Sequence, residues 1–151
     1  PGFKFWPDYK GRDGCRTPMI WDGSEHGGFT TATPWLPVKA PQLARNVAAQ
    51  EVAGSVLTLY RALLGWRKTS ALRDGRSTFF DVEPPVLAFR RDGADGSVFC
   101  AFNLSDQPIA LPVSGLAALD GPQSGASLSG PTLTLAPCGW VWARCEAGAE
   151  A

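Results

Sequence analysis

The stretch VLAFRRDGADGSVFCAFN, residues 86–103, decides the fold class of this chain. It consists of two short apolar runs, at 86–91 and 97–103, on either side of the turn-forming residues DGADG. Further strand-like runs lie at 77–82, 109–113, 132–135 and 140–145, and turn-forming residues lie at 104–108 and 124–131. Short strands at regular intervals with turns between them predict an antiparallel β-sandwich or barrel.

A helix is predicted before these strands, over residues 55–69. Ser55 is a favourable N-cap residue, and apolar side chains follow at spacings of three and four: Val56, Leu59, Tyr60, Leu63, Leu64 and Trp66. This wide apolar stripe needs a partner surface, which the weakly patterned loop before it does not offer. We therefore expect the helix to pack against a further part of a longer protein.

Residues 1–54 predict a long ordered loop. Prolines recur along it and exclude a long helix, at positions 1, 7, 18, 34, 37 and 41. The segment also carries aromatic residues, which a disordered linker lacks: Phe3, Phe5, Trp6, Tyr9, Trp21, Phe29 and Trp35. An ordered loop of this length is typical of a binding or active site.

Composition narrows the classes of partner. Lys plus Arg and Asp plus Glu number 14 each, so no net charge attracts nucleic acid or an anionic membrane surface. No run is long enough to span a bilayer. The 4 cysteines form no CxxC pair and His26 is the single histidine, so we expect neither a metal site nor a cofactor. Scattered thiols without a signal sequence indicate reduced cysteines and a cytoplasmic location.

Residues 11–22, GRDGCRTPMIWD, are the most informative for function. Arg12 and Arg16 lie four positions apart, Asp13 follows the first arginine, and Trp21 lies behind them. Guanidinium donors beside an aromatic face suit a pyranose, which presents hydroxyl groups and an apolar C–H face. The alternative, and the commoner outcome for such a stretch taken alone, is a structural loop held by local ion pairs.

GRDGCRTPMIWD and the following GGFTTATPWLPV closely resemble a pocket loop of the α-amylase superfamily, glycoside hydrolase family 13, in its α-glucosidases and oligo-1,6-glucosidases. SVLTLYRALLGWRK resembles the last barrel helix of that family, and FCAFNLSDQP resembles its carboxy-terminal β domain. The resemblance implies a carboxy-terminal part of such an enzyme. Residues 1–75 would end the catalytic (β/α)8 barrel with a long ordered loop and one or two helices. Residues 76–147 would form an antiparallel β-sandwich domain, and 148–151 would be a frayed tail.

The resemblance also implies a function and a site. The enzyme would be a retaining glycoside hydrolase that releases or transfers glucose from the non-reducing ends of α-glucosides such as maltose-like oligosaccharides. An arginine of this loop hydrogen-bonds the 4-hydroxyl of the terminal glucose in the family, a role that falls on Arg12, with Arg16 as second candidate. Asp13 and Thr17 would orient the arginines, and Trp21 would line or brace the pocket. The catalytic carboxylates belong to earlier barrel strands, so this chain is expected to hold no catalytic residue and to be inactive alone.

Two other functions stay open. A sucrose isomerase or transglucosidase shares the same loop, and a stand-alone β module could bind carbohydrate or act as a scaffold. His26 could contact a substrate, and so could Trp140 and Trp142, which share one face of a predicted strand. A loop histidine without a catalytic role and core packing of the two tryptophans are the favoured interpretations.

Overall fold

The chain forms two compact units, one that ends at Tyr60 and one that runs from Arg61 to Ala151. The computed structural model describes residues 12–151, so the predicted loop aromatics before Gly11 lie outside the described residues. The division between the two units falls within a helix. The boundary at residue 75 between the barrel and the β domain, which the family resemblance implies, stays a prediction. In the described range, no helix has the length and apolar character needed to cross a membrane.

The first unit is mostly irregular, as its prolines predict. Its described helical turns are short: η2 (Asp13–Cys15), α1 (Ala40–Leu43) and η3 (Ala48–Gln50). Pro41 lies in the first turn of α1, where its missing N–H leaves no hydrogen bond unmade. The prediction of an ordered loop without a long helix is thus confirmed for residues 12–54.

The predicted amphipathic helix is confirmed as α2 (Val56–Trp66). Ser55 caps it, because its Oγ accepts a hydrogen bond from the backbone N of Thr58 at 3.1 Å. The helix ends before the predicted limit at residue 69, since Lys68 and Thr69 each donate to the carbonyl three residues back and close a tight turn. Apolar side chains on α2 remain exposed, among them Val56, Tyr60 and Leu64.

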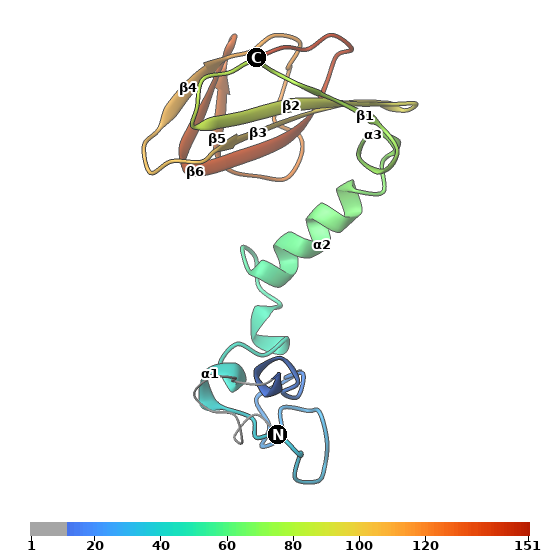
Figure 1. Cartoon of the computed structure of the whole chain (residues 1–151), viewed down its shortest axis with the longest axis vertical. Coiled ribbons are helices and arrows are strands. Elements are labelled where there is room, and N and C mark those ends of the chain that lie inside the picture. The colour runs from blue at the N-terminus through green and yellow to red at the C-terminus, as the bar shows by residue number, and fades with distance from the viewer. Residues whose placement is uncertain (1–11) are drawn as a thin grey trace. The chain divides into compact units, whose positions relative to one another are not determined.

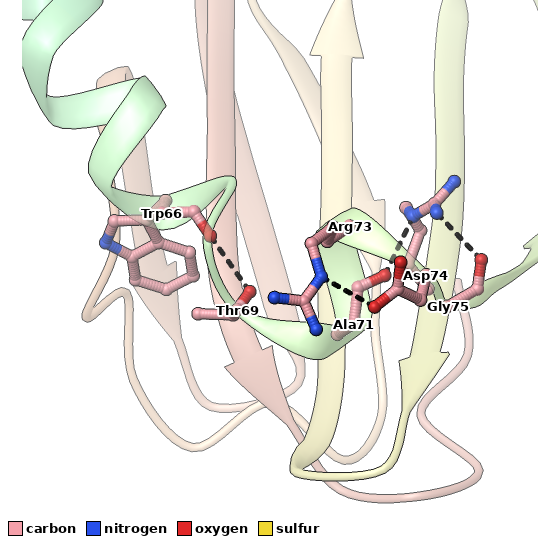
Figure 2. Close-up of polar contacts among 7 residues, drawn as sticks. Trp66, Thr69, Ala71, Arg73, Asp74 and Gly75 are labelled. Carbon is pink, nitrogen blue, oxygen red and sulfur yellow. Dashed lines mark hydrogen bonds and ion pairs between the residues drawn. The ribbon is translucent and has the colours of Figure 1, made fainter.

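A second, short helix, for which the sequence analysis gave no residue range, is α3 (Ser70–Arg73), and it joins α2 to the first strand. The guanidinium of Arg91 holds this connection, donating to the carbonyl oxygens of Ala71 at 3.0 Å and of Gly75 at 2.7 Å. Both acceptor residues are labelled in Figure 2, one on each side of the bend that leads into the sheet. The half-buried Arg91 therefore supplies a partner for one carbonyl of the short helix and for one just beyond its end.

The second unit is built on one 6-stranded antiparallel sheet (Figure 1). Its strands are β1 (Arg76–Phe79), β2 (Val86–Gly93), β3 (Gly96–Asn103), β4 (Ile109–Pro112), β5 (Gln123–Ser129) and β6 (Thr132–Cys145). Their order is β1-β2-β3-β6-β4, with β5 paired to β6. The stretch 86–103 forms the β2–β3 hairpin, paired from Val86 with Asn103 to Gly93 with Gly96, which confirms the predicted antiparallel domain.

The prediction of a turn over residues 124–131 is wrong. Most of this segment is β5, which pairs with residues in both halves of β6. Its sequence, QSGASLS, has little intrinsic preference for a strand, so nothing in it signals one. The backbone hydrogen bonds to β6 decide its conformation, and only the residues around Gly130 make the turn.

The predicted strands at 132–135 and 140–145 are the two halves of the single strand β6. Midway along it, Cys138 has a positive φ of 54°, which breaks the regular pleat. Such an irregularity bends a strand and increases its twist. The first half of β6 pairs with β4 and the second half with β3, so this bend turns one part of the sheet toward the other.

The sheet curls on itself (Figure 1). The main apolar core gathers buried side chains from β2, β3, β4 and β6. Phe99, Leu133, Leu135 and Val141 have no exposed surface and belong to one cluster. They come from β3 and from both halves of β6, so the sheet encloses its own core. The predicted sandwich is therefore one curled sheet rather than two separate ones.

The tail, expected to be frayed, is held against the sheet. Ser114 and Glu150 form an antiparallel bridge, and Ala149 is only 1% exposed. Arg90 donates a hydrogen bond from Nη1 to the carbonyl oxygen of Ala149 at 2.7 Å. These partners lie far away along the chain, so the polar and small residues of the tail gave no sign of the contact.

Candidate functional site

The two candidate arginines lie on one short turn, residues 12–17, which we call the arginine turn. Its backbone is closed by hydrogen bonds from Cys15 N to Arg12 O and from Arg16 N to Asp13 O, both at 3.1 Å. The Cys15 thiol also donates to Arg12 O, at 3.0 Å. Arg12 and Arg16 are both exposed. The turn thus holds the backbone of both arginines while their side chains reach solvent.

Asp13 pairs with Arg16. One of its carboxylate oxygens lies 3.9 Å from Arg16 Nη1. This ion pair involves Arg16, and the role of Asp13 in orienting the arginines stays a prediction. Both side chains are partly exposed, so the pair contributes only about 0–1 kcal/mol to stability.

The carboxy-terminal end of the arginine turn is anchored to the segment around α1 and η3. Gln42 Nε2 donates to the hydroxyl oxygen of Thr17 at 2.9 Å. Just beyond, Val47 N donates to Ile20 O at 3.0 Å, and Ala48 N donates to the carbonyl of the next residue at 2.9 Å. The sequence did not indicate Gln42, because it lies 25 positions from Thr17 and belongs to no shared local pattern.

Trp21 opens a second turn. Its side chain is 52% exposed, and its backbone N donates to Gly27 O at 2.7 Å. Asp22 accepts hydrogen bonds from the hydroxyl and the backbone N of Ser24, which hold the pKa of Asp22 below its usual value. A Cβ on Gly28, where φ is +67°, would lie 2.6 Å from an Asp22 carboxylate oxygen, so a larger residue there would be strained and would displace that carboxylate. The Asp-Gly-Ser sequence is a typical turn signal from which this motif could have been predicted.

A cleft of about 380 Å³ opens at the anchored end of the arginine turn. Its walls combine apolar and hydrogen-bonding side chains: Thr17, Pro18, Met19, Ile20, Gln42, Arg45, Val47 and Gln50. Of the predicted site residues, only Thr17 lines it. Arg12, Arg16 and Trp21 lie outside its lining, so this cleft is not the predicted arginine pocket.

The other candidates have local structural contacts. His26 is half-buried in the second turn, where its carbonyl accepts a hydrogen bond from Phe29 N at 3.1 Å. Trp142 packs against the buried cluster of Ala71, Val98 and Cys100, which confirms the core-packing interpretation for this tryptophan. Within residues 12–151, no three His, Cys, Asp or Glu side chains gather as a set of metal ligands.

Comparison with known sequences places these features in a family. The model of the α-amylase catalytic domain matches residues 3–75, which include the arginine turn and α2. A probable α-glucosidase of Rhizobium meliloti (strain 1021) is 46% identical over 124 residues, 80% of this chain and 22% of the relative. An oligo-1,6-glucosidase of Heyndrickxia coagulans is 38% identical over 105 residues, 68% of this chain and 19% of the relative. The chain thus spans about a fifth of the length of these curated relatives.

Solved structures agree with this assignment. The α-glucosyl transfer enzyme XgtA matches with a TM-score of 0.73 and 42% identity over 96% of this chain and 28% of that chain. The trehalulose synthase MutB from Pseudomonas mesoacidophila MX-45 matches with a TM-score of 0.71 and 25% identity, over 96% of this chain and 31% of that chain. The chain belongs to the α-amylase family, glycoside hydrolase family 13, and corresponds to a part of its α-glucosidase-type members.

Proposed function

We propose that the chain is the carboxy-terminal part of a retaining α-glucosidase that releases or transfers glucose from the non-reducing ends of α-glucosides. The similarity to a probable α-glucosidase over 80% of the chain supports this function. Retaining hydrolysis requires a carboxylate nucleophile and a carboxylic acid about 5–5.5 Å apart. In this proposal the rest of the enzyme supplies both groups, and the chain alone is inactive.

The arginine turn is the observation that carries the proposal. It presents two guanidinium groups from one exposed turn, inside the segment that matches the catalytic domain of the family. A guanidinium has only N–H donors, so it is suited to the oxygen lone pairs of sugar hydroxyls. Asp13 offsets part of the positive charge through Arg16, which favours an uncharged sugar over an anion.

Each residue of the turn has a proposed role. Arg12 donates to the 4-hydroxyl of the terminal glucose, and Arg16 is the second candidate for this contact. Asp13 orients Arg16, at the 3.9 Å separation of the pair. Trp21, with half of its side chain exposed, offers an apolar surface that can brace the substrate.

Replacement of Arg12 in the full-length enzyme tests this function. Arg12→Ala should lower kcat/KM for maltose by about 10–150-fold, because a hydrogen bond to a charged group contributes about 1.5–3 kcal/mol. Arg73→Ala is the matched control, since Arg73 is exposed and pairs on the surface with its neighbour Asp74. Equal, mild losses in the two variants would contradict the proposed role of Arg12.

A second candidate function is that of a dedicated transglucosidase or sucrose isomerase, in which hydrolysis is not the main reaction. The solved relatives XgtA and MutB favour it, since they are named as an α-glucosyl transfer enzyme and a trehalulose synthase. The arginine turn would serve both functions, because each begins by holding a terminal glucosyl unit. Product analysis separates them: glucose as the sole product of maltose indicates hydrolysis. Longer sugars from maltose, formed with one glucose released for each glucosyl unit transferred, or an isomer of sucrose from sucrose, indicate transfer or isomerisation.

A further inference from the structure

We propose that Gln42 is a positioning residue for the arginine turn, and that it sets how tightly the enzyme holds the terminal glucose. This inference rests on the proposed function of the turn. It assigns the role to a side chain that lies on α1, outside the motif that carries the arginines.

Both ends of the Gln42 amide are engaged. Nε2 donates to Thr17 Oγ1 at 2.9 Å, and Oε1 accepts from Lys39 N at 3.1 Å. A flipped amide would place Nε2 against the Lys39 N–H, two donors facing each other, so only one orientation satisfies both partners. Gln42 is half-buried, and it therefore connects α1 rigidly to the arginine turn.

The contact acts at the point where the arginine turn ends. Thr17 directly follows Arg16, whose own backbone N is bonded to Asp13 O. A displacement of Thr17 is therefore passed to Arg16 and, through the closed turn, to Arg12. Misplacement of a binding group by about 1 Å is enough to weaken binding and catalysis markedly.

Loss of Gln42 should loosen the turn without unfolding the unit around it. The backbone hydrogen bonds from Val47 N to Ile20 O and from Ala48 N to Trp21 O do not involve the Gln42 side chain. They keep the following segment in place when residue 42 changes. A Gln42 variant thus reports on the arginine turn rather than on global stability.

The test uses the full-length enzyme with maltose as substrate. Gln42→Leu should raise KM about 5–10-fold with a smaller change in kcat, since it removes an interaction that serves binding. Gln42→Glu should restore KM to within about twofold, because a carboxylate still accepts from Lys39 N and the Thr17 hydroxyl can reverse and donate to it. Gln50→Leu is the matched control, losing a single hydrogen bond to Arg45 O in the same unit.

A double-mutant cycle with Thr17→Val separates positioning from a general structural effect. If Gln42 acts through Thr17, the double variant has the same KM as Gln42→Leu alone. The inference would be overturned if the increases in KM of the two single variants multiplied in the double variant. It would also be overturned if KM of Gln42→Leu stayed within about twofold of the wild-type value.

A second measurement does not depend on activity. Amide hydrogen exchange of residues 12–17 should become faster in Gln42→Leu and stay unchanged in Gln50→Leu. Unchanged exchange in Gln42→Leu overturns the inference whatever the kinetics show. A wild-type enzyme that releases no glucose from any α-glucoside would overturn the proposed function instead, so the two failures are distinguishable.

Discussion

Gly121→Ala is expected to destabilise the second unit strongly, because Gly121 lies where a side chain cannot fit. A Cβ there would be 2.1 Å from Trp142 O and 2.5 Å from two ring carbons of Trp66. The same Trp66 ring carries the guanidinium of Arg144 4.9 Å from its centroid, and Arg144 is bonded to Asp120 at 2.7 Å. The indole is therefore held by contacts that leave it little room to move away.

The size of the effect follows from overpacking. Added volume in a tight contact costs about 1–3 kcal/mol. The nearest obstacle to the new methyl group is a backbone carbonyl of β6, which cannot move aside as a flexible side chain would. We therefore expect about 2–3 kcal/mol, which corresponds to a Tm lower by about 8–24 °C for a unit of this size.

Thermal unfolding followed by near-ultraviolet circular dichroism is the assay, since Trp66 and Trp142 report on this contact. Gly65→Ala is the matched control. Gly65 lies inside α2 and a Cβ there meets nothing within 4 Å, so this variant should gain about 0.5–1 kcal/mol. A Gly121→Ala protein whose Tm stays within about 2 °C of wild type would refute the reasoning.

Two further predictions concern titratable groups of the second unit. Hydrogen bonds from Ser97 and Arg90 lower the pKa of Asp92, so its stabilising contribution is present above its ordinary pKa and is lost as the pH falls through the lowered value. Asp92→Asn should therefore flatten the fall of Tm below about pH 4, and an unchanged acid profile would count against this coupling. Burial raises the pKa of the Cys100 thiol to about 12, whereas Cys15 is exposed. Under native conditions iodoacetamide should label Cys15 and leave Cys100 unmodified, as mass spectrometry can show, and early labelling of Cys100 would contradict its burial.

The elements that could be predicted from the sequence are those specified by neighbouring residues. The β2–β3 hairpin follows from two apolar runs around a Gly-rich turn, and α2 follows from its apolar spacing behind Ser55. In both cases the residues that decide the structure lie within a few positions of one another. The same holds for the arginine turn, whose motif carried the family resemblance that the comparisons confirm.

The strand β5 shows why other elements were missed. Its serine, glycine and alanine residues resemble a loop, and it becomes a strand only because β6 offers a row of backbone partners. The tail behaves in the same way, since Ala149 is buried by contacts with distant parts of the unit. Local propensity does not contain this information, because the free energy comes from contacts with distant residues.

By itself the sequence determined the antiparallel character of the sheet, the helix that precedes the strands, and the loop that carries the two arginines. Only the tertiary structure decided that one curled sheet closes the core and that Gln42 anchors the turn through Thr17. The physical reason is the range of the interactions. Periodicity and turn chemistry act between neighbours, whereas register, curl and side-chain anchoring depend on residues that folding brings together.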